Sequence, residues 1–167
     1  MPRVVALVLA AGASRRLGYP KQNVIYEGET LLDRATRIAR EVADEVIVVT
    51  RENNPDADEG MASSIRAGVA RAGSDARILI TLCDQPRVTA AHLRALIALD
   101  APIVASGYAG IAGVPAVFAP SLIPELLALH GDVGARAIID RHGAEVVPFE
   151  EAAYDVDLEC GDASRRF

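Results

Sequence analysis

The chain carries a cluster of basic side chains, Arg15, Arg16 and Lys21, soon after an apolar run over residues 4–11. Lys21 is the only lysine, because the other sixteen basic residues are all arginine. The compact ammonium of a lysine fits between phosphate oxygens, whereas a guanidinium is planar and bulkier. Small residues around Gly12 let backbone N–H groups approach a polyphosphate closely. The segment therefore predicts a nucleoside-triphosphate loop; the alternative is a surface loop with ordinary solvated cations.

Two acidic groups are candidate metal ligands. Asp84 follows the apolar run over residues 77–82, and a carboxylate at the end of a central strand beside a polyphosphate is well placed to hold Mg²⁺. The alternative role for Asp84 is a turn cap next to Pro86. Asp155 and Asp157 point to the same side if their stretch is extended, which fits a second ligand and a solvated acidic tail equally well.

Polar residues at expected helix starts are further candidates. Ser63 and Ser64 open one helix, where a helix N-terminus attracts anions and polar ligand edges, although simple capping explains one of them equally well. Asp132 is expected to cap a helix over residues 133–142. Arg136 stands in the first turn of that helix, where a cation is electrostatically out of place, and this hints at an anionic ligand.

Apolar runs alternate with helical patterns along the whole chain. This order predicts an α/β fold with three layers, a Rossmann-like, mostly parallel sheet with helices on both faces. The expected strands cover residues 3–10, 45–50, 77–82, 102–106, 114–118 and 145–149, and the expected helices cover residues 31–42 (capped by Thr30), 63–72, 90–99 (capped by Thr89), 121–129 and 133–142. Residues 51–60 form a loop in which Asp56, Asp58 and Glu59 are expected to be solvated charges. Ligands of such sheets bind beyond the carboxyl ends of the strands, so the loops after the first three strands should converge.

Length and composition narrow the class of protein. The 167 residues fit one domain over residues 1–167, with a core of aliphatic side chains because 51% of residues are hydrophobic and 4% aromatic. No apolar run approaches the roughly 20 residues of a membrane span. Cys83 and Cys160 are too few for a disulfide framework. The net charge of −6 argues against a nucleic-acid binder. We expect a cytoplasmic protein that binds neither nucleic acid nor membrane, as a monomer or weak homodimer.

Five motifs, in this order, span nearly the whole chain and resemble those of the MobA-like nucleotidyltransferases. The first, LAAGASRRLGYPK, is similar to the opening motif of that family. The other four resemble its molybdenum cofactor cytidylyltransferase branch. The motifs are LAAGASRRLGYPK (residues 9–21), GMASSIRAG (60–68), LCDQP (82–86), GVPAVF (113–118) and GDVGAR (131–136).

The resemblance implies a fold of the nucleotide-diphospho-sugar transferase type and the transfer of CMP from CTP to a molybdopterin-type phosphorylated acceptor, with Mg²⁺ and with release of pyrophosphate. Its catalytic residues would be Arg15, Lys21 and Asp84. By position, the nucleotide would be bound by Leu9, Ala10, Ala11, Gly12, Arg15, Lys21, Ser63 and Ser64. The acceptor would be bound by Gly113, Pro115, Asp132 and Arg136, and the metal by Asp84 together with Asp157 or Asp155.

Two other functions stay open from the sequence. The same fold would serve a guanylyltransferase or a sugar-phosphate nucleotidyltransferase. A regulator that binds a nucleotide without catalysis is the alternative outside the enzymes, and it fits the acidic segment over residues 155–162, which lacks the Thr-Pro usual in the family.

Overall fold

The computed structural model describes residues 1–12 and 20–154. Their central element is a six-stranded sheet with the strand order β4-β1-β5-β7-β6-β8. Neighbouring strands run parallel except at β7, which is antiparallel to both β5 and β6. The strands are β1 (Val4–Leu9), β4 (Glu45–Val49), β5 (Arg77–Leu82), β6 (Ile103–Tyr108), β7 (Ile111–Phe118) and β8 (Glu145–Pro148).

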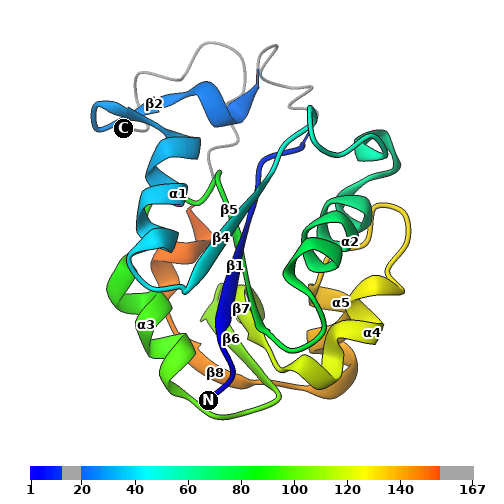
Figure 1. Cartoon of the computed structure of the whole chain (residues 1–167). Coiled ribbons are helices and arrows are strands. Elements are labelled where there is room, and N and C mark those ends of the chain that lie inside the picture. The colour runs from blue at the N-terminus through cyan, green and yellow to red at the C-terminus, as the bar shows by residue number, and fades with distance from the viewer. Residues whose placement is uncertain (13–19, 155–167) are drawn as a thin grey trace.

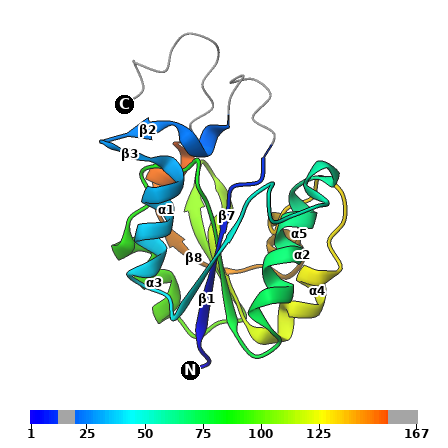
Figure 2. The same cartoon turned by 45° about the horizontal axis from the view of Figure 1, so that its top comes forward.

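Helices cover both faces of this sheet, as Figure 1 and Figure 2 show. Helices α1 and α3 lie on one face, and α2, α4 and α5 lie on the other. The helices are α1 (Leu31–Arg40), α2 (Met61–Ala72), α3 (Ala90–Ala98), α4 (Ile123–Leu127) and α5 (Arg136–His142). None of these helices is long and apolar enough to cross a lipid bilayer, which holds for all the residues that the structure describes. The predicted three-layer α/β fold is confirmed.

The central strands are buried on both faces, which explains their continuous apolar sequences. Successive side chains of a strand point to opposite faces, so one strand contributes to two separate clusters of the core. In β1 the two sets are Val5, Leu7 and Leu9 in one cluster and Val4, Ala6 and Val8 in the other. This double burial fits β1 as an interior strand between β4 and β5, with its carboxyl end at the edge where the candidate residues gather.

Two helix starts differ from the prediction in a way that bears on the site. Helix α2 begins at Met61, before the two serines, and its N-cap is Gly60. The backbone carbonyl of Gly131 accepts a hydrogen bond from Ala62 N–H at 3.2 Å, so a residue of another loop binds one of the backbone N–H groups at the start of this helix. Helix α5 begins at Arg136 with Ala135 as N-cap, so the prediction that Asp132 caps it was wrong. The predicted caps of α1 and α3 are confirmed by side-chain hydrogen bonds.

Two further segments were not anticipated. The expected helix over residues 121–129 is a 3₁₀ turn, Pro120–Leu122, followed by the short helix α4. After a 3₁₀ turn at Lys21–Asn23, the chain forms a small hairpin of β2 (Ile25–Tyr26) and β3 (Glu29–Thr30) that leads into α1. The hairpin lies beside the carboxyl edge of the main sheet (Figure 2).

A buried histidine connects α3 to the far half of the sheet. His92 Nε2 lies 2.7 Å from Ser106 Oγ, which donates to the carbonyl oxygen of Pro115 at 2.6 Å. Because the hydroxyl gives its one proton to Pro115, His92 Nε2 carries the hydrogen of this pair. The imidazole also stacks on Phe149, with ring centroids 4.0 Å apart. Burial lowers the pKa of His92 to about 4, so the ring is neutral at pH 7.

We expect the free energy of unfolding to fall as the pH is lowered from 6.5 to about 4. The unfolded chain, in which His92 has its ordinary pKa, binds the proton more readily than the folded protein. The difference corresponds to a loss of about 3 kcal/mol, complete below the folded pKa. Urea unfolding across this pH range measures it, and His92→Gln should lose this part of the dependence. An equally steep profile in His92→Gln would contradict the assignment.

Candidate functional site

The carboxyl ends of β1, β4 and β5 open into one cavity of about 480 Å³. These ends share an edge because β1 is parallel to both neighbours, with Leu9 in register with Val49 on one side and Leu82 on the other. The cavity is lined by Leu9, Ala10, Ala11, Gly12, Lys21, Gln22, Arg51, Ala57, Asp58, Glu59, Gly60, Met61, Ser64, Leu82, Cys83, Asp84 and Asp132. The predicted convergence of the three loops is confirmed.

The basic and acidic candidates meet inside this cavity. Lys21 Nζ lies 3.5 Å from Asp84 Oδ2, and each side chain is 21% exposed. Lys21 opens the 3₁₀ turn after the β1 loop, whereas Asp84 follows β5 by two residues. The parallel pairing of β1 and β5 therefore brings together two residues that are far apart in the sequence. The two side chains are partly buried, and the lower local dielectric strengthens the attraction between their charges.

Asp84 has an oxygen that fits a metal ion. Its Oδ1 atom is buried and finds no hydrogen-bond partner among the residues that the structure describes. A buried carboxylate oxygen without a partner is costly unless a ligand or cation satisfies it. Mg²⁺ is commonly held by one or two carboxylates together with substrate phosphates. Within residues 1–12 and 20–154, no group of three or more His, Cys, Asp or Glu side chains could hold a metal by itself. Asp84 would therefore share the ion with phosphate oxygens or with a carboxylate from elsewhere.

Three predicted site residues, Arg15, Asp155 and Asp157, lie outside the described residues. The chain immediately before Asp155 is nevertheless attached to the Asp84 loop at several points. Gln85 Nε2 donates to the Ala152 carbonyl at 3.1 Å, Arg87 pairs with Glu151 at 3.0 Å, and the Arg87 guanidinium lies 4.0 Å from the ring centroid of Tyr154. The chain thus reaches the loop of Asp84 one residue before the C-terminal acidic motif.

The two predicted serines have different surroundings. Both are buried, and Asn54 Nδ2 donates to Ser63 Oγ at 3.0 Å and to Ser64 Oγ at 3.1 Å. Ser63 donates its own proton to the carbonyl oxygen of Gly60 at 2.8 Å and does not line the cavity. Ser64 does line the cavity, and a hydroxyl that accepts from Asn54 still has its O–H to donate to a ligand.

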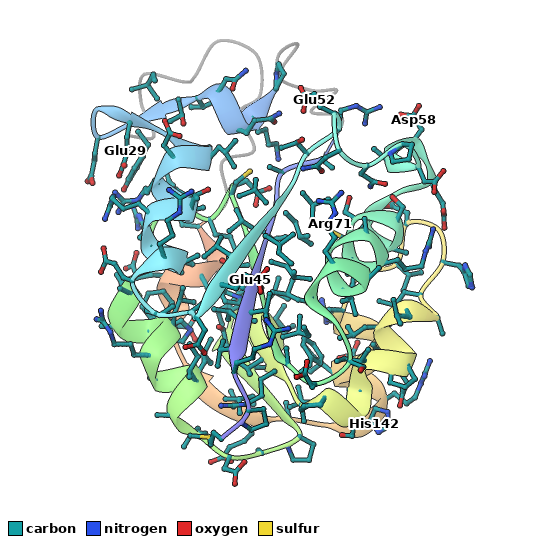
Figure 3. All side chains as sticks on the ribbon, in the orientation of Figure 1. Glu29, Glu45, Glu52, Asp58, Arg71 and His142 are labelled. Atoms are coloured by element: carbon teal, nitrogen blue, oxygen red, sulfur yellow. The ribbon has the colours of Figure 1, made fainter. Side chains whose placement is uncertain are left out.

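Arg51 lines the cavity and was missed by the sequence reasoning. Its Nη1 donates to the carbonyl oxygen of Ala11 at 3.3 Å, and its Nη2 pairs with Asp58. The guanidinium thereby connects the loop after β1 to the loop before α2, on which Asp58 lies (Figure 3). The sequence could have indicated Arg51, because it follows the carboxyl end of β4 and ligands bind beyond the carboxyl ends of parallel strands. Asp58 is solvated as expected, with its side chain 87% exposed, and it is in addition an ion-pair partner at the cavity.

Glu59, also expected to be a solvated charge, fastens two loops together. Its carboxylate accepts from both terminal nitrogens of Arg66 at 2.8 and 2.6 Å and from Gly131 N–H at 3.0 Å. Arg66 also donates to the Leu129 carbonyl at 2.8 Å. The hydrogen bonds from Arg66, which have the larger effect, and the hydrogen bond from Gly131 lower the pKa of Glu59 to about 2, so the carboxylate is ionised at pH 7.

The loops joined by Glu59 also touch through backbone alone. Gly60 has φ +127°, and a Cβ there would lie 2.7 Å from the carbonyl oxygen of Gly131. Only glycine combines this conformation with such a close approach. The contact brings Asp132 to the cavity wall, where it is one of the lining residues.

The other predicted acceptor residues do not line the cavity. Gly113 lies in β7, where a Cβ would come within 2.7 Å of the Tyr108 hydroxyl. The carbonyl oxygen of Pro115 accepts from Ser106 inside the protein, and Arg136 pairs with Asp140 at 3.6 Å on the surface. Of the four predicted acceptor residues, the structure therefore brings Asp132 into the cavity with Lys21 and Asp84.

Comparison with known proteins agrees with this geometry. A family model described as the MobA-like NTP transferase domain matches residues 6–146, which include the carboxyl ends of all three strands that end at the cavity. The purine catabolism protein PucB of Bacillus subtilis is 31% identical over 83% of this chain and 81% of its own. Nicotine blue oxidoreductase of Paenarthrobacter nicotinovorans is 31% identical over 98% of this chain and 90% of its own. A protein named probable molybdenum cofactor guanylyltransferase, from Synechococcus elongatus, is 32% identical over 54% of this chain and 55% of its own.

A solved protein has the same fold over almost its full length. The crystal structure of Rv0371c from Mycobacterium tuberculosis superposes with a TM-score of 0.82 at 30% identity, covering 99% of this chain and 97% of that one. A complex of Rv0371c with manganese gives a TM-score of 0.78 at 28% identity, covering 98% and 97%. Sequence, fold and cavity agree: the chain belongs to the MobA-like NTP transferase family and is a nucleotidyltransferase of that family.

Proposed function

We propose that this protein moves CMP from CTP to a phosphorylated acceptor of the molybdopterin type, with Mg²⁺ as cofactor and with release of pyrophosphate. The observation that carries the proposal is the Lys21–Asp84 pair, an ammonium and a carboxylate 3.5 Å apart in one cavity. A triphosphate needs a cation for its oxygens, and a divalent metal needs a carboxylate close to those oxygens. The manganese complex of Rv0371c supports a divalent metal, and the choice of Mg²⁺ rests on the donor chemistry of Asp84.

The proposed reaction is a single displacement at phosphorus. A terminal phosphate oxygen of the acceptor forms a bond to the α-phosphorus of the nucleotide, and the bond from that phosphorus to the pyrophosphate oxygen breaks. No covalent enzyme intermediate is needed, so the protein contributes positioning and charge neutralisation. Lys21 and Arg15 neutralise charge on the phosphate oxygens and on the departing pyrophosphate. Bound at Asp84 with Asp155 or Asp157, Mg²⁺ would supply Lewis-acid stabilisation of those oxygens.

The remaining binding roles follow from the cavity walls. We assign the nucleotide to the wall formed by residues 9–12 and Ser64, all of which line the cavity. Ser63 would act indirectly, because Asn54 donates to both serines and holds Ser64 in place. Asp132, on the opposite loop, would accept hydrogen bonds from N–H or O–H groups of the acceptor. The acceptor roles of Gly113, Pro115 and Arg136 stay predictions from the resemblance.

A guanylyltransferase is the second candidate. The 32% identity to the protein named probable molybdenum cofactor guanylyltransferase favours it. That match covers about half of each chain. A sugar-phosphate nucleotidyltransferase and a nucleotide-binding regulator without catalysis complete the alternatives. All four share the nucleotide site, so they differ in the base, the acceptor and the presence of turnover.

Two measurements on the purified protein decide among these functions. Melting temperatures with CTP, GTP, UTP or ATP, each with Mg²⁺, rank the bases, because a ligand that binds the folded state raises the melting temperature. Release of pyrophosphate with molybdopterin or sugar phosphates then tests the transfer. We expect the largest shift with CTP and turnover with molybdopterin. A preference for GTP would establish the second candidate, and nucleotide binding without pyrophosphate release under any acceptor would overturn the enzymatic proposal.

A further inference from the structure

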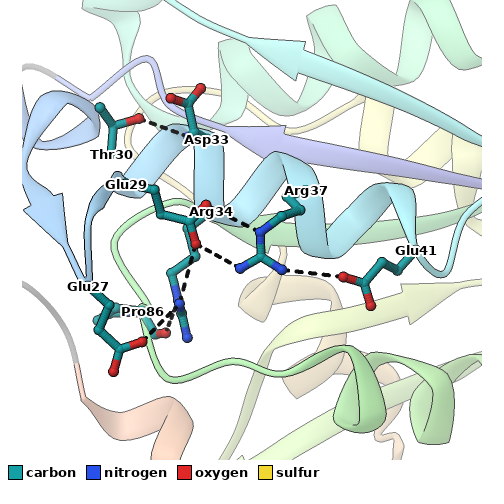
Figure 4. A network of polar contacts seen from close by, with 8 residues as sticks. All are labelled: Glu27, Glu29, Thr30, Asp33, Arg34, Arg37, Glu41 and Pro86. Atoms are coloured by element: carbon teal, nitrogen blue, oxygen red, sulfur yellow. Dashed lines mark hydrogen bonds and ion pairs between the residues drawn. The ribbon is translucent and has the colours of Figure 1, made fainter.

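Arg34, on helix α1, contacts the loop that carries Asp84. Its Nε atom donates to the carbonyl oxygen of Pro86 at 2.7 Å, two residues beyond Asp84 (Figure 4). The side chain is only 16% exposed, so this contact is largely protected from water. Arg34 does not line the cavity, so it contacts the loop of Asp84 and Pro86 from outside the cavity. The hydrogen bond from a charged donor to a backbone carbonyl is of the stronger kind.

The same guanidinium holds the hairpin that follows Lys21. Its Nη1 atom pairs with Glu27 Oε2 at 3.2 Å and with Glu29 Oε1 at 3.5 Å (Figure 4). The centre of the guanidinium also lies 4.9 Å from the ring centroid of Tyr26. Glu27, Glu29 and Tyr26 belong to the β2–β3 hairpin and its turn, which begin two residues after the Lys21–Asn23 turn.

We propose that Arg34 is a positioning residue, which fixes the separation of Lys21 and Asp84 by clamping the hairpin after Lys21 to the loop after Asp84. The inference rests on the proposed function for the roles of Lys21 and Asp84, and it adds the residue that acts through them. The two loops leave different strands of the sheet. Arg34 joins them through one rigid planar group, in addition to the Lys21–Asp84 pair itself.

One acidic partner of Arg34, Glu29, is held in its charged form by neighbouring cations. The hydrogen bond from Arg37, together with the charges of Arg37 and Arg34, lowers the pKa of Glu29. A planar guanidinium donates in several fixed directions at once, so it can hold Pro86 and the glutamates together. A lysine at this position has a single ammonium at the end of a flexible stem and cannot reproduce that geometry.

Arg37 offers a matched control on the same helix. It pairs with Glu29 at 2.7 Å and with Glu41 at 3.3 Å, and its side chain is 52% exposed (Figure 4). In the described part of the chain, its side-chain bonds go to carboxylates and not to the Asp84 loop. Arg37→Met therefore removes one positive charge and one partner of Glu29 while the Arg34–Pro86 bond stays. A general effect of charge or helix stability should be equal in the Arg34 and Arg37 variants.

The test compares Arg34→Ala, Arg34→Lys and Arg37→Met at a temperature well below their melting temperatures. We expect Arg34→Ala to weaken Mn²⁺ binding, measured by the electron paramagnetic resonance of free Mn²⁺ with CTP present, by roughly 10- to 100-fold. The turnover number should fall by a similar factor with little change in KM for the nucleotide. Arg34→Lys should recover only part of this loss, and Arg37→Met should resemble the wild type.

Rescue separates positioning from a purely structural role. Guanidinium chloride at millimolar concentration, far below denaturing levels, should restore part of the Mn²⁺ affinity and turnover of Arg34→Ala and leave Arg37→Met unchanged. Equal losses in Arg34→Ala and Arg37→Met, or Mn²⁺ binding as tight as in the wild type, would overturn the proposal for Arg34. A wild-type protein that binds Mn²⁺ and nucleotide but releases no pyrophosphate would instead overturn the proposed function, and the Mn²⁺ comparison would still decide the role of Arg34.

Discussion

Asp84→Asn is expected to lower the rate of pyrophosphate release by roughly 100- to 1000-fold. The substitution keeps the shape of the side chain and removes its negative charge, so it weakens the hold on a divalent cation and leaves Lys21 without its ionic partner 3.5 Å away. The remaining activity should respond weakly to Mg²⁺, because the residue that would bind the ion has lost its charge. Turnover titrated against Mg²⁺ concentration measures both effects, and an unchanged titration would sink the metal role of Asp84.

The fold should tolerate this change well, which separates the loss of activity from unfolding. Within the described part of the chain, Asp84 Oδ1 is buried without a hydrogen-bond partner, so its charge costs stability in the absence of metal and the substitution removes this cost. The loss of the ion pair with Lys21 opposes this gain, so we expect the melting temperature of Asp84→Asn without metal to lie close to that of the wild type. Asp75→Asn is a suitable control, because Asp75 is 79% exposed and pairs with Arg3 away from the cavity. This control should keep both the activity and the Mg²⁺ response.

The sequence predicted the centre of the site because the centre depends on local patterns. Lys21 and Asp84 each follow a continuous apolar run, and such runs form the buried parallel strands β1 and β5. Once these strands are parallel neighbours, their carboxyl ends lie at one edge, and residues of the loops that follow them meet in one cavity. The prediction used the order and type of the elements together with the residue types in the loops that follow them.

The walls of the site could not be predicted in the same way. Glu59 binds Gly131 N–H across 72 positions of the chain, and this contact depends on how two loops pack together. A local pattern predicted that Asp132 caps a helix, but the helix starts later and Asp132 goes to the cavity wall. The role of Arg34 was hidden for the same reason, because its bond to Pro86 spans 52 positions. Contacts between distant loops are set by tertiary packing, which the spacing of residues along one element does not reveal.

Lys21→Ala is the variant that tests the triphosphate site most directly, and we expect it to lower turnover by roughly 100- to 1000-fold. The ammonium is preorganised beside Asp84 in a partly buried cavity, where a lost donor to phosphate oxygens is not replaced by water at equal strength. Lys21→Arg should recover only part of the rate, since the planar guanidinium keeps the charge but is bulkier than the ammonium. Near-normal turnover of Lys21→Ala in steady-state kinetics would refute the assignment.

The composition of the chain allows an independent test of the same contact without any substitution. Lys21 is the only lysine, so reductive methylation of amines modifies Lys21 and the N-terminal amino group alone. A bound triphosphate should slow methylation of Lys21 and leave the N-terminus unaffected, because Met1 is exposed and does not line the cavity. Mass spectrometry of the two sites gives the ratio directly. Equal methylation rates of Lys21 with and without a saturating nucleotide would mean that the ammonium does not touch the phosphates, and the loss of activity in Lys21→Ala would then need another cause.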